Sequence, residues 1–359
     1  MVPQPLRGKL VVELSQYIAA PVAGQLLADF GAEVIKVEAP GGDGSRGLPG
    51  TEFGSVYTRS FNTSKSSLVI DTREDADRER LFELLTRADA LVSNLSPAAL
   101  AKLGLAPAEA RQRFPRLVVT LISGYGQDDP RTCLDTIAQC ESGFAWINGA
   151  DEATPQVAAG WPIDVFSGMY AAMSTAMALA DPTRTEGCVV DVAMLEVATG
   201  ALMGPAALTL AEGGALGAPT GNRDRASAPS SIYPCRDGHI YIYGGLDPFW
   251  KKLRPLVGGE ERPIAERIGR AAEYDAMVAD WTGQRPRAEV LATLQELGVP
   301  AGAVRHPGEA LDLLRQARPG AVSAQTATGE YVPSFPVIFD GERPARTPAP
   351  VLGGERGRR

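Results

Sequence analysis

Residues 10–38, LVVELSQYIAAPVAGQLLADFGAEVIKVE, contain the pattern that decides the fold. Leu10–Leu14 and Glu33–Glu38 are short runs rich in apolar and β-branched residues, which is typical of buried strands. Between them, apolar side chains recur at helical spacing over 22–30, and Gly31 is a residue type that commonly ends a helix. A strand, a helix and a second strand in this order predict a βαβ unit in a parallel sheet.

The alternation of strands and helices continues along the chain. Strands are predicted at 67–71, 90–94 and 117–122, with a charged helix at 74–87. This order predicts an α/β fold with a doubly wound parallel sheet, in which ligands bind beyond the carboxyl ends of the strands. The loops that we expect around this crevice are 15–21, 39–47, 71–73, 94–97 and 123–135.

The second half of the chain has a different composition. Residues 170–215 are rich in alanine and predict two long helices with a strand at 188–192 between them. A segment rich in Gly, Pro, Ala and Ser at 213–229 is a candidate domain boundary. Beyond it, 231–243 predicts a β-hairpin, and the tail from 317 predicts an extended segment. The helices predicted between hairpin and tail are 247–256, 261–282, 286–297 and 307–316.

Composition excludes several classes of function. The net charge of −8 gives no support for a nucleic-acid partner, which needs clustered basic residues. The 4 cysteines form no CxxC pair and the chain has 2 histidines, so we expect no metal site. The N-terminus lacks the apolar region of a signal peptide, and no apolar run reaches the ~18 residues of a membrane span. We therefore expect a cytoplasmic protein without a membrane partner.

The candidate catalytic group is a carboxylate at a predicted helix start. Asp164 follows Gly160-Trp161-Pro162 and precedes the helix-prone stretch 166–179. An aspartate in the first turn of a helix commonly accepts hydrogen bonds from free N–H groups and complements the helix dipole. From spacing alone, a helix cap is the favoured interpretation of Asp164.

A resemblance raises the catalytic alternative. Besides 19–38, the segments that carry it are, in chain order, Asn62 with Lys65, Ile70-Asp71, Pro115-Arg116-Leu117-Val118, Ser123-Gly124-Tyr125-Gly126-Gln127, Asp135 with Ala138-Gln139, the stretch around Asp164, Gly221-Asn222, Asp237-Gly238, Gly298-Val299-Pro300-Ala301-Gly302 and Ala349-Pro350-Val351-Leu352-Gly353. As an ordered set they resemble the family III CoA-transferases. This family includes formyl-CoA transferase and the carnitine CoA-transferases, and the α-methylacyl-CoA racemases are its relatives.

The resemblance implies a domain organisation and an assembly. It implies a large CoA-binding α/β domain over 1–215, a smaller inserted α/β domain over 216–304, and a return segment over 305–359 that completes the large domain. It also implies a homodimer whose two chains interlock.

The resemblance further implies a reaction. Asp164 would attack an acyl-CoA thioester, and an aspartyl anhydride and an aspartyl-CoA thioester would follow before CoA passes to a carboxylic acid. A carboxylate is ordinarily ionised at neutral pH, so it needs no general base to become a nucleophile. Backbone N–H groups near Asp164 or in the loop Ile18–Ala20 would stabilise the oxyanion.

The resemblance places one set of residues around CoA, which is a substrate here, with no permanently bound cofactor. The set is Ile18, Ala19, Ala39, Ile70, Arg73, Asn94, Lys102, Gly124, Tyr125, Arg131, Leu134 and Asp135. Arg73 and Lys102 correspond to basic residues that contact CoA, and Asn94 to an asparagine at the pantetheine arm. For a lone Arg or Lys, a solvated surface charge is the competing interpretation.

Departures from the family pattern narrow the function. Ile18 replaces a glutamine of formyl-CoA transferase, Ala20 replaces the glycine of an Ala-Gly-Pro motif, and 222–227 replaces a glycine-rich flap. These changes argue against formyl-CoA and oxalate as the substrate pair. An acyl-CoA racemase is a weaker alternative, because Leu134 stands where racemases have a proton-carrying histidine. A non-catalytic acyl-CoA-binding relative is the other alternative.

Overall fold

The computed structural model describes residues 1–47, 58–150, 153–211, 213, 218–325 and 331–354. The chain divides into two compact units. The first comprises Met1–Phe144, Val157–Leu216 and Leu314–Arg359, and the second comprises Ala145–Gln156 and Gly217–Leu313. The expected domain boundary at 215/216 lies outside the described residues, and the boundary at 304/305 stays a prediction.

The first unit is built on a parallel sheet of six strands in the order β3-β2-β1-β4-β5-β6. Every neighbouring pair is parallel, so the predicted α/β class with a parallel sheet is confirmed. The strands are β1 (Leu10–Leu14), β2 (Glu33–Glu38), β3 (Ser66–Val69), β4 (Ala90–Ser93), β5 (Val118–Ser123) and β6 (Val189–Ala193). The order reverses between β1 and β4, and ligands of doubly wound sheets bind beyond such a reversal.

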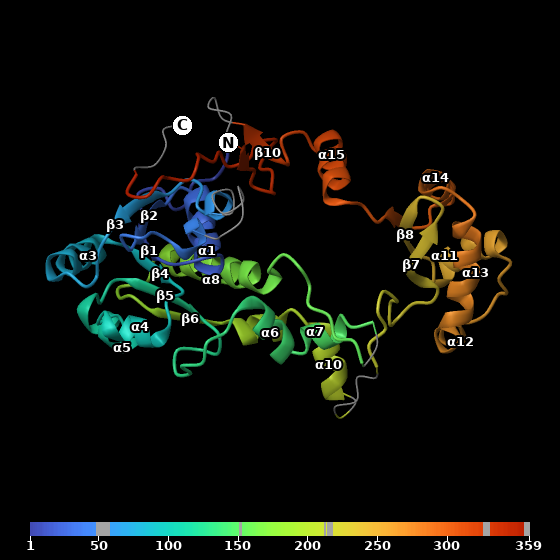
Figure 1. Ribbon diagram of the computed structural model, residues 1–359, viewed down its shortest axis with the longest axis horizontal. Helices are drawn as coiled ribbons and strands as arrows, with labels where there is room; N and C mark the ends of the chain where they lie inside the picture. The colour runs from blue at the N-terminus through green and yellow to red at the C-terminus, as the bar shows by residue number, and fades with distance from the viewer. Residues whose placement is uncertain (48–57, 151–152, 212, 214–217, 326–330, 355–359) are drawn as a thin grey trace. The chain divides into compact units, whose positions relative to one another are not determined.

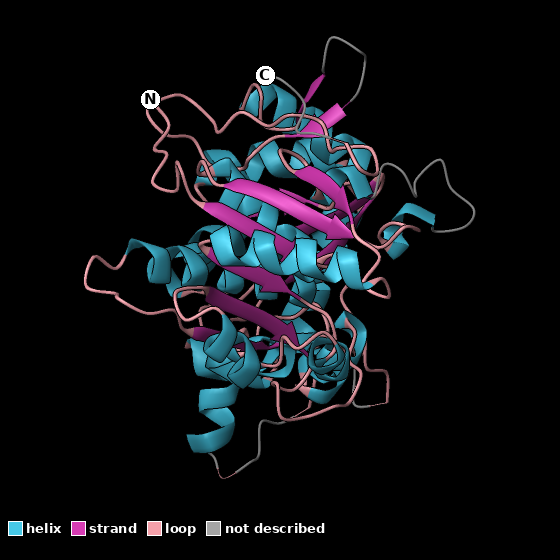
Figure 2. Cartoon of the chain, turned by 90° about the vertical axis from the view of Figure 1, so that its left-hand side faces the viewer, coloured by secondary structure: helices cyan, strands magenta, loops and turns pink. Residues whose placement is uncertain are grey.

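Helices cover both faces of this sheet (Figure 2). The helical elements of the first unit are α1 (Ala19–Asp29), η1 (Gly44–Gly47), α3 (Asp75–Arg87), α4 (Pro97–Lys102), α5 (Pro107–Arg113), α6 (Asp135–Glu141), α8 (Pro162–Ala180), α9 (Met194–Gly200) and α10 (Met203–Ala211). Because strand side chains alternate between faces, Val11 and Val92 pack on the side of α1 and α8, whereas Val12 and Leu91 pack on the side of α3 to α5. The sheet therefore separates two apolar layers.

Helices α1 and α8 lie side by side on one face of the sheet (Figure 1). A Cβ atom at Gly168 of α8 would stand 2.5 Å from the carbonyl oxygen of Ala19 and 2.8 Å from Val22, so only glycine permits this approach. By length and composition α8 is also apolar enough to cross a membrane, as core helices of globular proteins often are. Here Ile163 and Ala171 are buried in the core of the first unit.

The second unit has its own core around an antiparallel sheet. Its elements are β7 (Ser230–Cys235), β8 (Gly238–Tyr243), α11 (Asp247–Val257), α12 (Ile264–Gly269), α13 (Ala271–Gly283), α14 (Arg287–Leu297) and β9 (Ala301–Ala303). The predicted hairpin is present as β7 and β8. The remaining elements of the chain are α7 (Phe144–Ile147), α15 (Pro307–Ala317), β10 (Ser323–Gln325) and β11 (Tyr331–Pro333).

The structure corrects several predicted elements. The single helix expected over 261–282 is two helices, because the backbone leaves the helical conformation at Arg270, directly after Gly269, a poor helix former. The second alanine-rich helix is also broken, with a bend of 77° between α9 and α10. Helices α4, α5 and α6 were not predicted.

Candidate active site

The chain enters α8 through two consecutive residues with positive φ values. Gly160 has a φ of +88°, and Trp161 is left-handed with a φ of 56°. Pro162 is the first helical residue, where its fixed φ suits the helix and its missing N–H is not needed. Asp164 therefore lies in the first turn, so the predicted helix start is confirmed.

The cap of α8 is Asp135, not Asp164. Asp135 is 2% exposed, and its Oδ2 accepts the N–H groups of Ile163 at 2.7 Å and Asp164 at 3.1 Å. The N–H of Val165 donates to the carbonyl oxygen of Trp161 at 3.2 Å. Since proline has no N–H, the donors at the head of α8 are satisfied without the Asp164 side chain.

Among the residues that the structure describes, no group stabilises the charge of the Asp164 carboxyl. The side chain is half-buried, and within the described residues it makes no hydrogen bond or ion pair. Burial, together with the negative charge of Asp135, raises the pKa of Asp164 to about 7. The expectation of full ionisation at neutral pH is therefore corrected, because the neutral and ionised forms coexist there.

The free end of α1 lies on the same side of α8 as Asp164. Asp164 and Gly168 are one turn apart and share a helix face, and Gly168 packs on the carbonyl of Ala19. Ile18 precedes α1 and Ala19 opens it, and both are buried. A helix N-terminus presents unbonded N–H groups and partial positive charge, which suits a developing oxyanion.

Several predicted residues gather on the loop between β5 and α6. A Cβ atom at Gly124 would stand 2.2 Å from the Cβ of Cys133, so this contact requires glycine. The Arg131 guanidinium stacks on the Tyr125 ring at 3.8 Å and pairs with Asp129 at 2.8 Å. Leu134, which directly precedes Asp135, is 60% exposed.

A cavity of about 310 Å³ lies beyond the carboxyl ends of β1, β2 and β4, next to the reversal of strand order. The predicted residues Ala39, Ile70 and Lys102 line it together. The side chain of Asn94 accepts the N–H of Gln16 at 2.9 Å and donates to its carbonyl at 2.8 Å. Asn94 thus joins the loops after β1 and β4, and its contact with pantetheine stays a prediction.

Arg73 does not line this cavity. Its guanidinium donates to both oxygens of Asp71 at 2.8 and 2.7 Å, and its side chain is 81% exposed. Its predicted contact with CoA stays a prediction, and it would require this local pair to open or reorient.

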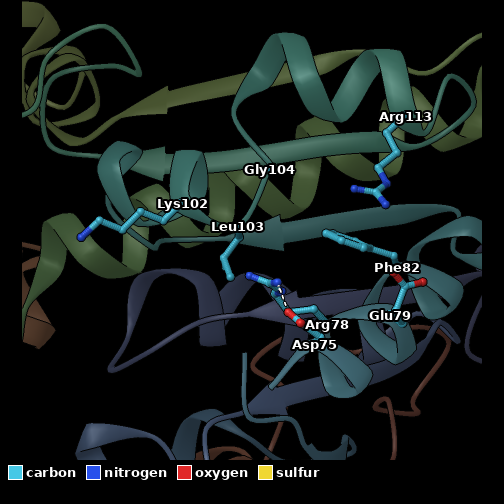
Figure 3. A pocket seen from close by; sticks show the side chains of 8 residues that line it. All are labelled: Asp75, Arg78, Glu79, Phe82, Lys102, Leu103, Gly104 and Arg113. Atoms are coloured by element: carbon cyan, nitrogen blue, oxygen red, sulfur yellow. Dashed lines mark hydrogen bonds and ion pairs between the residues drawn. The ribbon is translucent and has the colours of Figure 1, made fainter. Parts of the chain in front are cut away.

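A second cavity, of about 470 Å³, adjoins the first because Lys102 and Leu103 line both. In Figure 3 Arg113 stacks on Phe82, with 3.7 Å between guanidinium carbon and ring centroid, while Arg78 pairs with Asp75. Lys102 extends away from Arg113 (Figure 3), and among the described residues it has no ion-pair partner. An unpaired lysine between two cavities is well placed to meet an anion.

A buried charge network that was not predicted from the sequence comprises Glu13, Lys36, Asp43 and Lys65. Lys36 Nζ lies 3.1 Å from Glu13 and 2.9 Å from Asp43, and Lys65 Nζ lies 2.8 Å from Glu13, with all four side chains fully buried. The signal was present, because Glu13 and Lys36 interrupt apolar strands and stand opposite each other in register. Asp43 also lines the smaller cavity, so the network supports its wall.

Metal binding finds no support in the geometry. Within the part of the chain that the structure describes, no group of three or more His, Cys, Asp or Glu side chains is arranged to hold a metal ion. The chemistry available at the head of α8 is that of a carboxylate.

Comparisons with known proteins place the chain among CoA-transferases. The family model described as CoA-transferase family III matches residues 6–356. The succinate–glutarate CoA-transferase of Agrobacterium fabrum is 30% identical, over 97% of this chain and 93% of that protein. The formyl-CoA:oxalate CoA-transferase of Bradyrhizobium diazoefficiens is 29% identical, over 83% of this chain and 78% of that protein.

Solved structures agree with the sequence comparisons. A CaiB/BaiF family protein from Brucella suis matches with a TM-score of 0.86 and 28% identity, covering 98% of this chain and 97% of that one. The match of the family model along almost the whole chain, together with the relatives, determines the assignment. The chain belongs to CoA-transferase family III and is a CoA-transferase.

Proposed function

We propose that Asp164 is the nucleophile that carries CoA from an acyl-CoA donor to a carboxylic acid. The observation that carries this proposal is the division of roles at the head of α8. Asp135 takes the N–H donors, whereas Asp164 keeps a half-buried carboxyl with a pKa of about 7. A carboxylate that is neither hydrogen-bonded nor paired retains its basicity, and therefore its nucleophilic strength.

The proposed reaction proceeds through acyl exchange on Asp164. The carboxylate oxygen of Asp164 attacks the thioester carbonyl. The C–S bond breaks, CoA leaves as a thiolate, and a mixed anhydride between the acyl group and Asp164 remains. The thiolate then attacks the aspartyl carbonyl, which releases the donor acid and leaves an aspartyl-CoA thioester. The acceptor carboxylate attacks this thioester, which releases the thiolate and forms a second mixed anhydride. The thiolate then attacks the acceptor carbonyl of this anhydride, which gives the new acyl-CoA and frees the Asp164 carboxylate.

The oxyanion of each tetrahedral intermediate needs hydrogen-bond donors. The N-terminal turn of α1, at Ala19 and Ala20, supplies N–H groups on the side of α8 that carries Asp164 and Gly168. We assign the oxyanion site to this helix end.

We propose that the nucleotide part of CoA occupies the cavity lined by Ala39, Ile70 and Lys102. This cavity has an apolar wall suited to a base and lies beyond the carboxyl ends of the strands. Lys102 then meets a phosphate, since it stands between the two cavities without a partner among the described side chains.

We also propose a homodimer. Met169, Tyr170, Met173 and Met177 of α8 and Met203 of α10 are 46–77% exposed, which is a large apolar surface for a protein in water. A second copy of the chain would cover it. Light scattering at micromolar concentration should give the mass of a dimer, and a monomeric mass would refute the assembly.

The experiment that tests the function separates it from its alternatives. Acyl-CoA is incubated with an isotopically labelled carboxylic acid, and label entering the thioester is measured by mass spectrometry. Transfer predicts that the label enters acyl-CoA only when the enzyme is present. Exchange of the α-proton without entry of label would identify a racemase, and the absence of both would identify a binding protein.

A further inference from the structure

The segment 158–164 leads into α8 through a backbone conformation that is intrinsically disfavoured. Gly160 and Trp161 both have positive φ values, and Trp161 carries a large side chain in this disfavoured region. Such a conformation persists only where other groups fix it. Two side chains of α6 bind the segment on either side of this turn.

Gln139 grips the segment before the turn. It is fully buried, its Oε1 accepts the N–H of Ala158 at 2.7 Å, and its Nε2 donates to the carbonyl oxygen of Ala158 at 3.1 Å. One side-chain amide therefore satisfies both backbone groups of one residue, as a neighbouring strand would. The same Nε2 also donates to Oδ1 of Asp135, so the two side chains act as one unit.

Asp135 grips the segment after the turn, through its bonds to the N–H groups of Ile163 and Asp164. The Asp135–Gln139 pair thus holds the chain on both sides of 160–162. The pair touches Asp164 at the backbone, while the Asp164 carboxyl makes no hydrogen bond among the described residues. These hydrogen bonds fix the position of the Asp164 backbone and leave the Asp164 carboxyl oxygens available to react.

We propose that Asp135 and Gln139 are positioning residues for the transfer reaction, a clamp that holds the Asp164 carboxylate in line with the thioester carbonyl. This inference rests on the proposed role of Asp164. A displacement of about 1 Å in a reacting group costs roughly 100-fold in rate. The clamp therefore acts on the chemical steps and leaves the affinity for acyl-CoA largely unchanged.

The test uses Asp135→Asn. In this variant an NH₂ group replaces one carboxylate oxygen, so it faces either the Gln139 amide donor or the N–H groups of α8.

The primary readout is the rate at which acyl-CoA acylates Asp164, followed by peptide mass spectrometry. We expect Asp135→Asn to lower this rate by about 10–100-fold, with KM for acyl-CoA changed less than about threefold. An unchanged rate in a folded Asp135→Asn enzyme would overturn the clamp.

Two further variants keep the test informative. Asp181→Asn makes the same chemical change at the far end of α8, where Asp181 accepts the N–H of Thr183 at 2.8 Å, and it should leave the rate unchanged. If Asp135→Asn does not fold, Gln139→Met removes the grip while keeping the volume, and it should lower kcat without raising KM. A folded Gln139→Met enzyme with normal kcat would contradict the clamp.

The same measurement distinguishes this inference from the function on which it rests. If wild-type enzyme is never acylated at Asp164, the nucleophile is wrong. If wild type is acylated and the clamp variants are acylated as fast, the nucleophile stands and the clamp is wrong.

Discussion

Two parts of the first unit bury carboxylates, and they shift the pKa values of Asp43 and Asp164 in opposite directions. In the buried charge network, each carboxylate lies within 3.1 Å of a lysine ammonium. Burial alone would raise the pKa of Asp43, but Lys36 and nearby hydrogen bonds hold it below its ordinary value. At the head of α8, burial and the charge of Asp135 raise the pKa of Asp164 to about 7.

The comparison distinguishes buried carboxylates that hold the structure together through ion pairs from a buried carboxyl that is available for a reaction. A buried ion pair holds its two sides in place, and removing one partner is costly. A buried carboxyl whose charge is repelled by a neighbouring carboxylate destabilises the folded state when it ionises, and groups with such perturbed pKa values concentrate at functional sites. The network therefore supports the wall of the cavity, whereas the unpaired carboxyl of Asp164 is the group to which we assign the proposed reaction.

The largest expected effect is that of Asp164→Asn on turnover. Asparagine has nearly the same shape and is far too weak a nucleophile to open a thioester, so kcat should fall by about 10³-fold or more. Circular dichroism and the thermal transition check that the variant is folded. A folded variant that turns over normally would place Asp164 with the structural charges.

Lys36→Met should have the opposite character, with its main effect on stability. It leaves Glu13 and Asp43 short of one cation in a fully buried place, which should cost about 3–5 kcal/mol in the free energy of unfolding. Lys9→Met is the matched control, because Lys9 pairs with Asp89 at a partly exposed site and should cost about 1 kcal/mol or less. Equal losses in denaturant unfolding would show that burial is not what distinguishes the network.

The pH dependence of the reaction tests the raised pKa directly. Only the ionised carboxylate attacks. Among the described residues, the charge of Asp135 acts on Asp164, and Asp164 in turn acts on Cys133. The value of kcat/KM for acyl-CoA should be level above pH 7 and fall about tenfold per unit below it. A profile that is level down to pH 5 would mean that Asp164 is ionised like an ordinary aspartate.

The same shift predicts a pH-dependent change in stability. The folded-state pKa of Asp164 is about 7 and the ordinary value is 3.8, so this group's contribution is retained below pH 3.8 and lost as the pH rises towards 7. Asp164→Asn removes the charge, so it should raise the melting temperature at pH 8 and leave it nearly unchanged at pH 4. A variant that is less stable than wild type at pH 8 would show that the carboxylate is stabilising after all.

The smallest expected effects concern CoA affinity. Lys102→Ala should weaken CoA binding by about 1–3 kcal/mol, the scale of a charge-assisted hydrogen bond. Arg73→Ala should weaken it less, because Arg73 is exposed and already bonded to Asp71. Isothermal calorimetry checks both, and a larger loss for Arg73→Ala would move the phosphates of CoA to its side of the site.

The sheet was predictable because its strands are short runs of mostly apolar residues, as in 10–14 and 90–93, and because α1 has strong helical spacing. Helices α4 and α5 were not predicted because each is about two turns long or shorter, which is too short to show a periodic pattern. Their sequences still contain the signal, since Ser96 caps α4 and a proline opens each helix.

At the site, the local sequence correctly predicted that Asp164 lies at a helix start, but its favoured interpretation as the helix cap was wrong. The N–H groups of α8 are capped by Asp135, 29 residues from Asp164 in the sequence, and a distant cap is invisible to a rule based on neighbouring residues. The pairing of Arg73 with Asp71 is local, yet nothing in the sequence said whether the arginine would turn to Asp71 or to a cavity. The long-range contacts that decide these roles follow only from the fold.

The central claim is that Asp164 forms a covalent acyl intermediate. Enzyme is mixed with acyl-CoA, quenched with hydroxylamine and digested, and the peptide containing 162–180 is analysed by mass spectrometry. We predict a hydroxamate at Asp164 that depends on acyl-CoA and is absent from Asp164→Asn. An unmodified Asp164 in enzyme that is actively transferring CoA would contradict the account.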